Sequence, residues 1–237
     1  RLSNNTLIIL DAGSGIRELA AELKKRREKL SEIHLFFTHF HWDHLQGLPF
    51  FTPAYDRNVT INMYNQDERF ESYLRNQMIQ PHFPIVMEAM SAKIHYHILK
   101  GSSLEIGGAK ISYRKMKHPG SSTAYKVTEN GKTIIFSTDT ELMEEDFQRT
   151  QENIEFFQGA DILIMDSQYT LDEAIEKYNW GHSSYSLAVD FANEWEIKKL
   201  ILFHHEPMYD DKKMHSILNS ARWYLTHLEN DTLKIYL

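Results

Sequence analysis

Apolar runs and amphipathic stretches alternate at the start of the chain, and this pattern predicts a βαβ opening. Residues 6–10 are expected to form one strand, and the apolar run 33–38 a second, buried strand. Between them, Ser14 is a candidate N-cap for a helix whose apolar side chains recur at helical spacing. These side chains are Ile16, Leu19, Ala20, Leu23 and, furthest along, Leu30. Strand, helix and strand in this order are typical of a βαβ unit.

The rest of the chain mixes both kinds of element. Further strands are expected over residues 59–64, 93–99, 109–116, 122–128, 132–137, 160–166, 199–203 and 233–237. Helices are expected over residues 67–80, 184–195 and 212–228, and residues 67–90 are either a cap over a site or ordinary core. Asn130-Gly131 separates two strands and is a strong hairpin signal. The pattern indicates an α+β protein with two mixed β-sheets packed together and helices outside.

Length allows one large domain or two small ones, since the chain has 237 residues. An apolar content of 42% supplies a substantial core. We interpret residues 1–237 as a single domain. The chain opens on Arg1 rather than a methionine and reaches a strand almost at once, so we expect that some N-terminal residues are missing.

Charge and composition narrow the classes of function. A net charge of −7 argues against bulk nucleic-acid binding through phosphates. Cysteine is absent, which excludes disulfides and thiolate metal sites and fits a cytoplasmic protein. No run approaches the roughly 20 apolar residues of a membrane span, and no signal-peptide pattern is present, so no membrane partner is expected.

One stretch, residues 38–47, concentrates side chains that bind metals. His39, His41, Asp43 and His44 lie within six positions, directly after the second predicted strand. Gly47 then breaks the pattern, which predicts a loop at the carboxyl end of that strand. In an extended segment His39, His41 and Asp43 point to one side, and a helical turn can move His44 toward a second centre. Imidazole and carboxylate are ligands of zinc, manganese and iron.

Four later positions also follow predicted strands. His118, Asp139, Asp166 and the pair His204-His205 each stand at or just after the end of an apolar run. Each of them alone is more typical of a surface or hydrogen-bonded residue than of a ligand. Together, ligands at the ends of several strands are expected to converge on one edge of a sheet.

These residues resemble the metal-binding motifs of the metallo-β-lactamase superfamily, in the same order and over nearly the whole chain. The motifs are His39-x-His41-x-Asp43-His44, His118, Asp139 and the His204-His205 pair. The resemblance implies an αββα sandwich with a dinuclear site at one edge. It also implies the ligands: His39, His41 and His118 for one ion, Asp43, His44 and His204 for the other, and Asp139 between them. His205 is the alternative to His204. Zinc is the expected metal, with manganese or iron as alternatives.

Two further segments indicate the subgroup. A bridging aspartate is typical of family members that act on phosphoesters and of the glyoxalase II type, whereas true β-lactamases generally carry cysteine there. Residues 11–15 resemble the family's early DxGxG segment, which is usually structural. Residues 180–184 resemble the Gly-His-Ser segment of ribonuclease Z and related phosphodiesterases, which gives His182 a role beside the scissile phosphate. The alternative is a plain helix N-terminus capped by Ser183 or Ser184.

The resemblance therefore implies a metal-dependent phosphodiesterase that uses a metal-bridging hydroxide, with Asp43 and His182 as catalytic residues. The expected substrate is a cyclic nucleotide or another small phosphodiester, and the chain could form a homodimer. A tRNA-processing role is disfavoured, because ribonuclease Z has a glutamate where this chain has Phe136. Alternatives are a thioester hydrolase of the glyoxalase II type, a flavin-linked diiron protein, and a nucleotide-sensing domain with little turnover.

Overall fold

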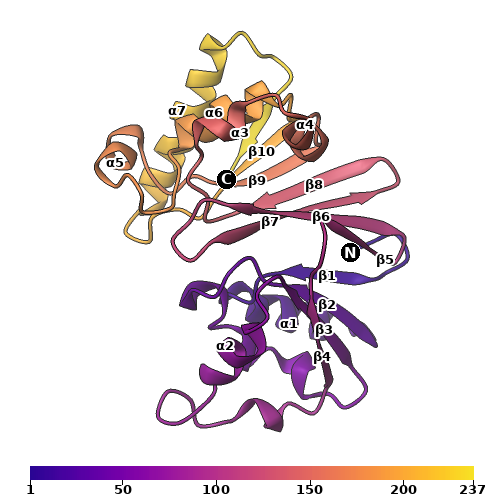
Figure 1. The fold of residues 1–237 in the computed structure, drawn as a ribbon. Coiled ribbons are helices and arrows are strands. Elements are labelled where there is room, and N and C mark those ends of the chain that lie inside the picture. Colours follow the sequence, from indigo (N-terminus) through magenta and orange to yellow (C-terminus); the bar gives the residue numbers. More distant parts are fainter. The chain divides into compact units, whose positions relative to one another are not determined.

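Eleven strands form a four-stranded sheet and a seven-stranded sheet in this computed structural model, which describes residues 1–237. The chain divides into two units, Arg1–Gly101 and Ser102–Leu237, each of which contains one of the sheets (Figure 1). The strands are β1 (Leu7–Leu10), β2 (Glu32–Phe36), β3 (Thr60–Asn65), β4 (Lys93–Ile98), β5 (Ser103–Ile106), β6 (Ala109–Met116), β7 (Ser122–Glu129), β8 (Lys132–Ser137), β9 (Ile162–Asp166), β10 (Lys199–Phe203) and β11 (Lys234–Tyr236). The helices are α1 (Gly15–Lys25), α2 (Phe70–Asn76), α3 (Glu144–Phe147), α4 (Gln151–Phe157), α5 (Leu171–Glu176), α6 (Tyr185–Glu194) and α7 (Asp211–His227).

The sheet of the first unit has the order β1-β2-β3-β4, and every neighbouring pair is parallel. The predicted βαβ opening is confirmed by the parallel pair β1–β2 with α1 between them. The prediction of a mixed sheet is wrong for this unit. Each of β1, β2 and β3 is followed by a helix or a long loop that returns the chain to the end of the sheet where the strands begin, and such crossovers produce parallel neighbours.

The core of the first unit lies on one face of this sheet. Ile33 and Leu35 of β2 and Ile61 of β3 are completely buried there, and Ile16 of α1 packs into the same cluster. Phe70 of α2 joins it as well. Residues 67–90 therefore contribute core packing, as one of the two sequence-based readings expected.

The sheet of the second unit is mixed and has the order β11-β10-β9-β8-β7-β6-β5. Strands β5 to β8 form an antiparallel meander, and β8 to β11 are parallel. The predicted hairpin between β7 and β8 is confirmed: Asn130 and Gly131 have φ values of 49° and 72°, and a type I′ turn requires positive φ at both positions.

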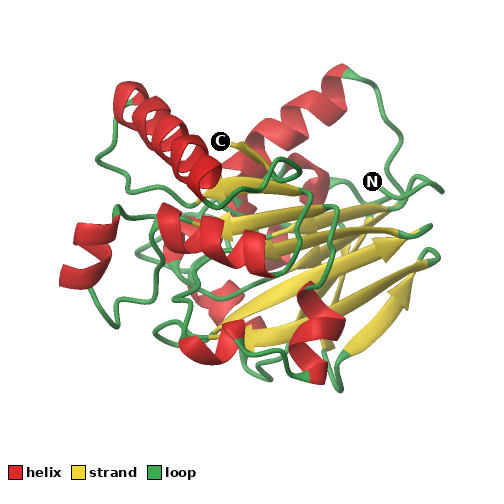
Figure 2. Cartoon of the chain, turned by 90° about the horizontal axis from the view of Figure 1, so that it is seen from above, coloured by secondary structure: helices red, strands yellow, loops and turns green.

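Helices α4, α6 and α7, which are labelled in Figure 1, pack against this second sheet. Figure 2 shows helices in red beside the yellow strands. Phe157 of α4, Phe191 of α6 and Ala221 of α7 are all completely buried in one cluster with Leu163 of β9 and Leu200 of β10. These side chains form the apolar faces that the helical spacing predicted for α6 and α7.

Some element boundaries differ from the sequence-based expectation. Helix α1 ends at Lys25, so Leu30 packs on the core from a loop. The helix expected over residues 67–80 spans only Phe70–Asn76. Strand β5 and helices α3, α4 and α5 were not predicted, because they are short and carry little periodic signal. No helix combines the length and the apolar character that a bilayer crossing requires.

Candidate active site

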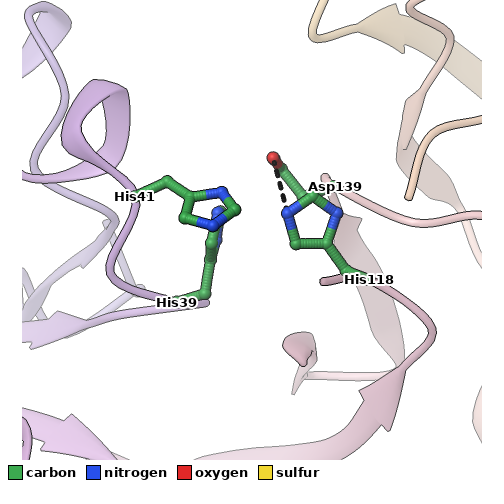
Figure 3. Close-up of side chains that lie close together, drawn as sticks. All are labelled: His39, His41, His118 and Asp139. Carbon is green, nitrogen blue, oxygen red and sulfur yellow. Dashed lines mark ion pairs between the residues drawn. The ribbon is translucent and has the colours of Figure 1, made fainter. Parts of the chain in front are cut away.

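The loop after β2 carries the candidate metal-binding side chains of the first unit. His41 is extended, with φ −66° and ψ 153°, and the 3-10 turn Trp42–His44 follows it. This turn brings His44 back toward His39, whose ring centroid lies 4.3 Å from that of His44 and 4.4 Å from that of His41. Figure 3 shows His39 and His41 on this loop. The expected helical turn is therefore present, and it gathers the imidazoles.

Asp11 holds two of these histidines in place from the end of β1. Its Oδ2 accepts a hydrogen bond from His44 Nδ1 at 2.8 Å, and another from the Thr38 hydroxyl at 2.8 Å. The same hydroxyl accepts a hydrogen bond from His39 Nδ1 at 3.0 Å. A partner at Nδ1 fixes the ring and directs Nε2 to coordination, which is the usual arrangement of metal-binding histidines. Asp11 has φ 62°, a strained conformation that is common at functional sites.

The glycines beside this loop allow the backbone segments to approach closely. A Cβ atom at Gly13 would lie 2.3 Å from the carbonyl oxygen of Asp43. One at Gly47 would lie 2.0 Å from the carbonyl oxygen of Gly13. The Ala12 amide donates to the His44 carbonyl at 2.8 Å in the same place. The DxGxG segment is therefore structural, and it packs directly against the candidate metal-binding loop.

In the second unit, the strand-end residues His118, Asp139 and His204 come together. Oδ1 of Asp139 lies 3.7 Å from Nε2 of His118, as the dashed line in Figure 3 shows. Oδ2 of Asp139 lies 3.5 Å from Nε2 of His204. The backbones of Asp139 and His204 have φ values of 50° and 56°. Asp139 is 1% exposed and faces a different histidine with each oxygen, which is the arrangement that a bridging carboxylate needs.

These spacings fit a shared metal ion. Four ligands at about 2.0–2.1 Å from zinc in a tetrahedron lie about 3.3 Å from one another. Within the first unit, His44 Nε2 and Asp43 Oδ2 are 3.1 Å apart. The two contacts of Asp139 are a few tenths of an ångström longer. Nitrogen and oxygen donors of this kind suit zinc, manganese and iron, so the residues present fit divalent metal ions.

His205 has a different environment from His204. Its Nε2 donates a hydrogen bond to the Leu202 carbonyl at 3.0 Å, back along β10. The pKa of His205 is lowered, mainly because its ring is buried. The geometry therefore favours His204 over His205 as the late ligand.

His182, which is partly buried, pairs with Asp166. Its Nδ1 donates to Asp166 Oδ2 at 2.7 Å, and Asp166 is completely buried at the end of β9. The His182 ring stacks on that of His204, with centroids 5.0 Å apart and planes 10° apart. It also lies edge-on to His118 at 5.0 Å. Ligand atoms of Asp166, His182 and His204 lie within 4.8 Å of one another, so His182 stands beside the proposed ligands.

The resemblance to ribonuclease Z places an acidic partner of His182 at position 136, but the acidic residue that contacts His182 is Asp166. Phe136 occupies that position here, and its ring packs on Phe203 with centroids 5.6 Å apart. Asp166 was recognised in the sequence as a strand-end residue, but its role as the partner of His182 was missed. No local signal links two residues that are 16 positions apart and joined by α5 and an irregular loop.

Glu141 is a second residue that the sequence did not reveal. Its carboxylate is buried and accepts hydrogen bonds from the backbone amides of Asn179 at 2.8 Å and Gly181 at 3.1 Å. The Gly181 carbonyl in turn accepts a hydrogen bond from His118 Nδ1 at 2.9 Å. A Cβ atom at Gly181 would lie 2.3 Å from that same nitrogen, and its φ is 93°. Glycine is therefore required here.

The two serines of the Gly-His-Ser segment have separate structural roles. Ser184 caps α6 by accepting a hydrogen bond from the Leu187 amide at 3.2 Å. Ser183 donates to the Thr140 carbonyl at 2.7 Å and thereby fixes the segment beside the Asp139 loop. The helix N-terminus expected here is present, and it coexists with the His182–Asp166 pair.

Comparisons with known proteins find a matching family model, similar sequences and similar solved structures. A family model described as the beta-lactamase superfamily domain matches residues 6–205. Ribonuclease Z from Oceanobacillus iheyensis is 23% identical, over 96% of this chain and 88% of that protein. The metallo-beta-lactamase fold protein YhfI from Bacillus subtilis has a TM-score of 0.69 and 18% identity, over 96% of this chain and 83% of that one. A diphosphatase from the PhnP family has a TM-score of 0.67 and 18% identity, over 98% of this chain and 77% of that one. Both solved structures share their fold with this chain.

Proposed function

This chain belongs to the beta-lactamase superfamily, and we propose that within it the chain is a phosphodiesterase with two divalent metal ions. Its substrates are small phosphodiesters such as cyclic nucleotides. One observation carries the proposal: Asp139 faces His118 with one carboxylate oxygen and His204 with the other. An aspartate in this position is typical of family members that act on phosphoesters and of the glyoxalase II type. The relatives named ribonuclease Z and diphosphatase support hydrolysis at phosphorus.

We assign the ligands as the family resemblance implies. They are His39, His41 and His118 for one ion, Asp43, His44 and His204 for the other, with Asp139 shared. Support comes from inside each unit, where the Nδ1 atoms of His39, His44 and His118 each have a hydrogen-bond partner. We propose zinc, since imidazole and carboxylate ligands at tetrahedral spacing suit it.

Two divalent ions held by these side chains would polarise the phosphoryl group and lower the pKa of a water nucleophile. The chain's own groups then position that water and move protons. Asp43, whose side chain is about half exposed beside His44, accepts a hydrogen bond from the attacking water. His182 donates a proton from Nε2 to the departing oxygen. Asp166 stabilises the imidazolium form through Nδ1, at 2.7 Å.

A substrate panel tests the proposal. The metal-loaded protein is expected to hydrolyse bis-p-nitrophenyl phosphate and cyclic nucleotides, and to leave an acyl-glutathione thioester untouched. His182→Ala is expected to lower turnover of the phosphodiesters without loss of bound metal. Thioester hydrolysis in the absence of phosphodiester hydrolysis would replace this function by one of the glyoxalase II type. Tight binding of a cyclic nucleotide with no product over hours would indicate a sensor instead.

A further inference from the structure

A cavity of about 600 Å³ lies in the second unit, between α5, α6 and α7. Its walls include Leu171 and Ile175 of α5, Trp223 of α7, and Tyr178 from the loop after α5. This volume lies within the range of small-molecule pockets, about 300–1,000 Å³. His182 forms part of the wall. The cavity is therefore bordered by the side chain that we assign to proton donation.

Four large apolar side chains of the cavity wall are exposed to an unusual degree. Leu171, Ile175, Tyr178 and Trp223 are 55%, 68%, 60% and 64% exposed. Apolar side chains gathered in this way usually mark a binding site, because leaving them in contact with water is unfavourable. The two aromatic side chains add flat surfaces against which a ring can pack.

The charges of the cavity exclude a polyanionic occupant. Its lining contains two carboxylates, Glu141 and Asp190, and no lysine or arginine. Glu141 is bound to backbone amides, and Asp190 accepts a hydrogen bond from the Tyr224 hydroxyl at 2.8 Å. Nucleic-acid phosphates are bound chiefly by lysine and arginine, which this cavity lacks. An uncharged group is the occupant that these walls fit.

We propose that this cavity binds an uncharged aromatic ring carried by the departing alcohol of the substrate. The inference rests on the proposed phosphodiesterase function and names its substrate class: small diesters whose leaving group carries an aryl ring or a nucleobase. His182 is the link, since it borders the cavity and lies beside His118 and His204. A ring in the cavity places the ester oxygen of its alcohol next to the proton donor.

The test measures binding of two non-hydrolysable probes, phenylphosphonate and methylphosphonate, to the metal-loaded protein by calorimetry. They share the phosphonate group and differ in the ring. The wild-type protein is expected to bind phenylphosphonate about 10- to 100-fold more tightly, the range that burial of one aromatic side group supplies. Equal affinities would overturn the proposal.

Variants localise the preference. Ala174→Trp on α5 fills the cavity and is expected to bring the affinity ratio close to one, with methylphosphonate binding unchanged. Trp223→Ala removes one wall and is expected to reduce the ratio severalfold. It remains informative if Ala174→Trp does not fold. Tyr236→Ala is the control, because Tyr236 is an exposed aromatic residue outside the cavity lining. An unchanged ratio in both cavity variants would contradict the assignment.

Failure of this inference is distinguishable from failure of the proposed function. Phosphodiester hydrolysis without a preference for phenylphosphonate would remove the aromatic site and leave the phosphodiesterase. A preference for phenylphosphonate without hydrolysis of any phosphodiester would leave the aromatic site and remove the phosphodiesterase function. Oligoribonucleotides that compete with phenylphosphonate more strongly as they lengthen would overturn the assignment to small diesters.

Discussion

Replacing Asp166 by asparagine separates proton donation from metal binding. Oδ1 of Asp166 accepts hydrogen bonds from the amides of Ser183 at 3.0 Å and Gln168 at 3.2 Å, and an asparagine carbonyl can retain both. The new amide group would then replace Oδ2 and donate toward His182 Nδ1. His182 must accept at Nδ1, so its proton moves to Nε2 and the imidazolium form loses its stabilising partner.

The size of the effect follows from the role of the pair. General acid catalysis contributes about 10²- to 10⁴-fold to a rate, or about 2.7–5.4 kcal/mol. We expect Asp166→Asn to lower kcat about 100-fold or more for a cyclic nucleotide, whose alkoxide needs a proton to leave. For bis-p-nitrophenyl phosphate the loss should stay below about tenfold, since p-nitrophenolate leaves unprotonated. The Thr140 amide, 3.3 Å from Oδ2, would face an amide donor, which costs about 1–3 kcal/mol of stability.

The assay compares kcat for the two substrates, with bound metal and Tm measured on the same samples. Asp161→Asn is the matched control, because Asp161 belongs to the same unit but binds Lys132 and Lys198 on the surface. Equal losses for both substrates with metal intact would refute the role of His182 as the acid. Loss of metal would show that Asp166 acts mainly on His204, whose Nδ1 lies 3.8 Å from Oδ2.

Three further outcomes are expected. Asp139→Ala should abolish turnover and reduce bound metal while the protein stays folded, because it removes both oxygens that face histidines; full activity in a folded variant would end the assignment. His204→Ala should lose metal and activity, whereas His205→Ala should keep its metal content by elemental analysis; the opposite pattern would exchange the two roles. Hydrogen bonding, chiefly from Lys198, lowers the pKa of Asp161 to about 2. Its stabilising contribution is therefore complete above the unfolded pKa of about 4 and is lost as pH falls toward 2. Denaturant unfolding between these pH values should show a weaker pH dependence in Asp161→Asn, and an unchanged one would contradict this.

Local patterns explain why much of the candidate site could be predicted. His39, His41, Asp43 and His44 are close in sequence, so strand and turn geometry alone brings them together. Asp139 could be placed because it lies just after the end of a predicted strand. For residues this close in sequence, the periodicity of the backbone determines which side chains lie near one another.

Long-range pairings explain what the sequence did not reveal. The hydrogen bond between Asp166 and His182 depends on the path of the chain through α5, and Glu141 reaches Gly181 across 40 positions. The parallel order of strands in the first sheet is also a long-range property, because it depends on the path of the crossovers between the strands. The core-facing part of α2 was expected to extend to residue 80, but the helix ends at Asn76, before Pro81. Helix ends are set by local capping and packing rather than by apolar spacing alone.

The central claim is that two divalent ions bind to this chain and are needed together for phosphodiester hydrolysis. Titration of metal-free protein with zinc, followed by elemental analysis and by turnover of bis-p-nitrophenyl phosphate, tests it most directly. We predict that turnover reaches its full value only when two ions are bound per chain. Full turnover in metal-free protein, or with a single ion bound, would contradict the account.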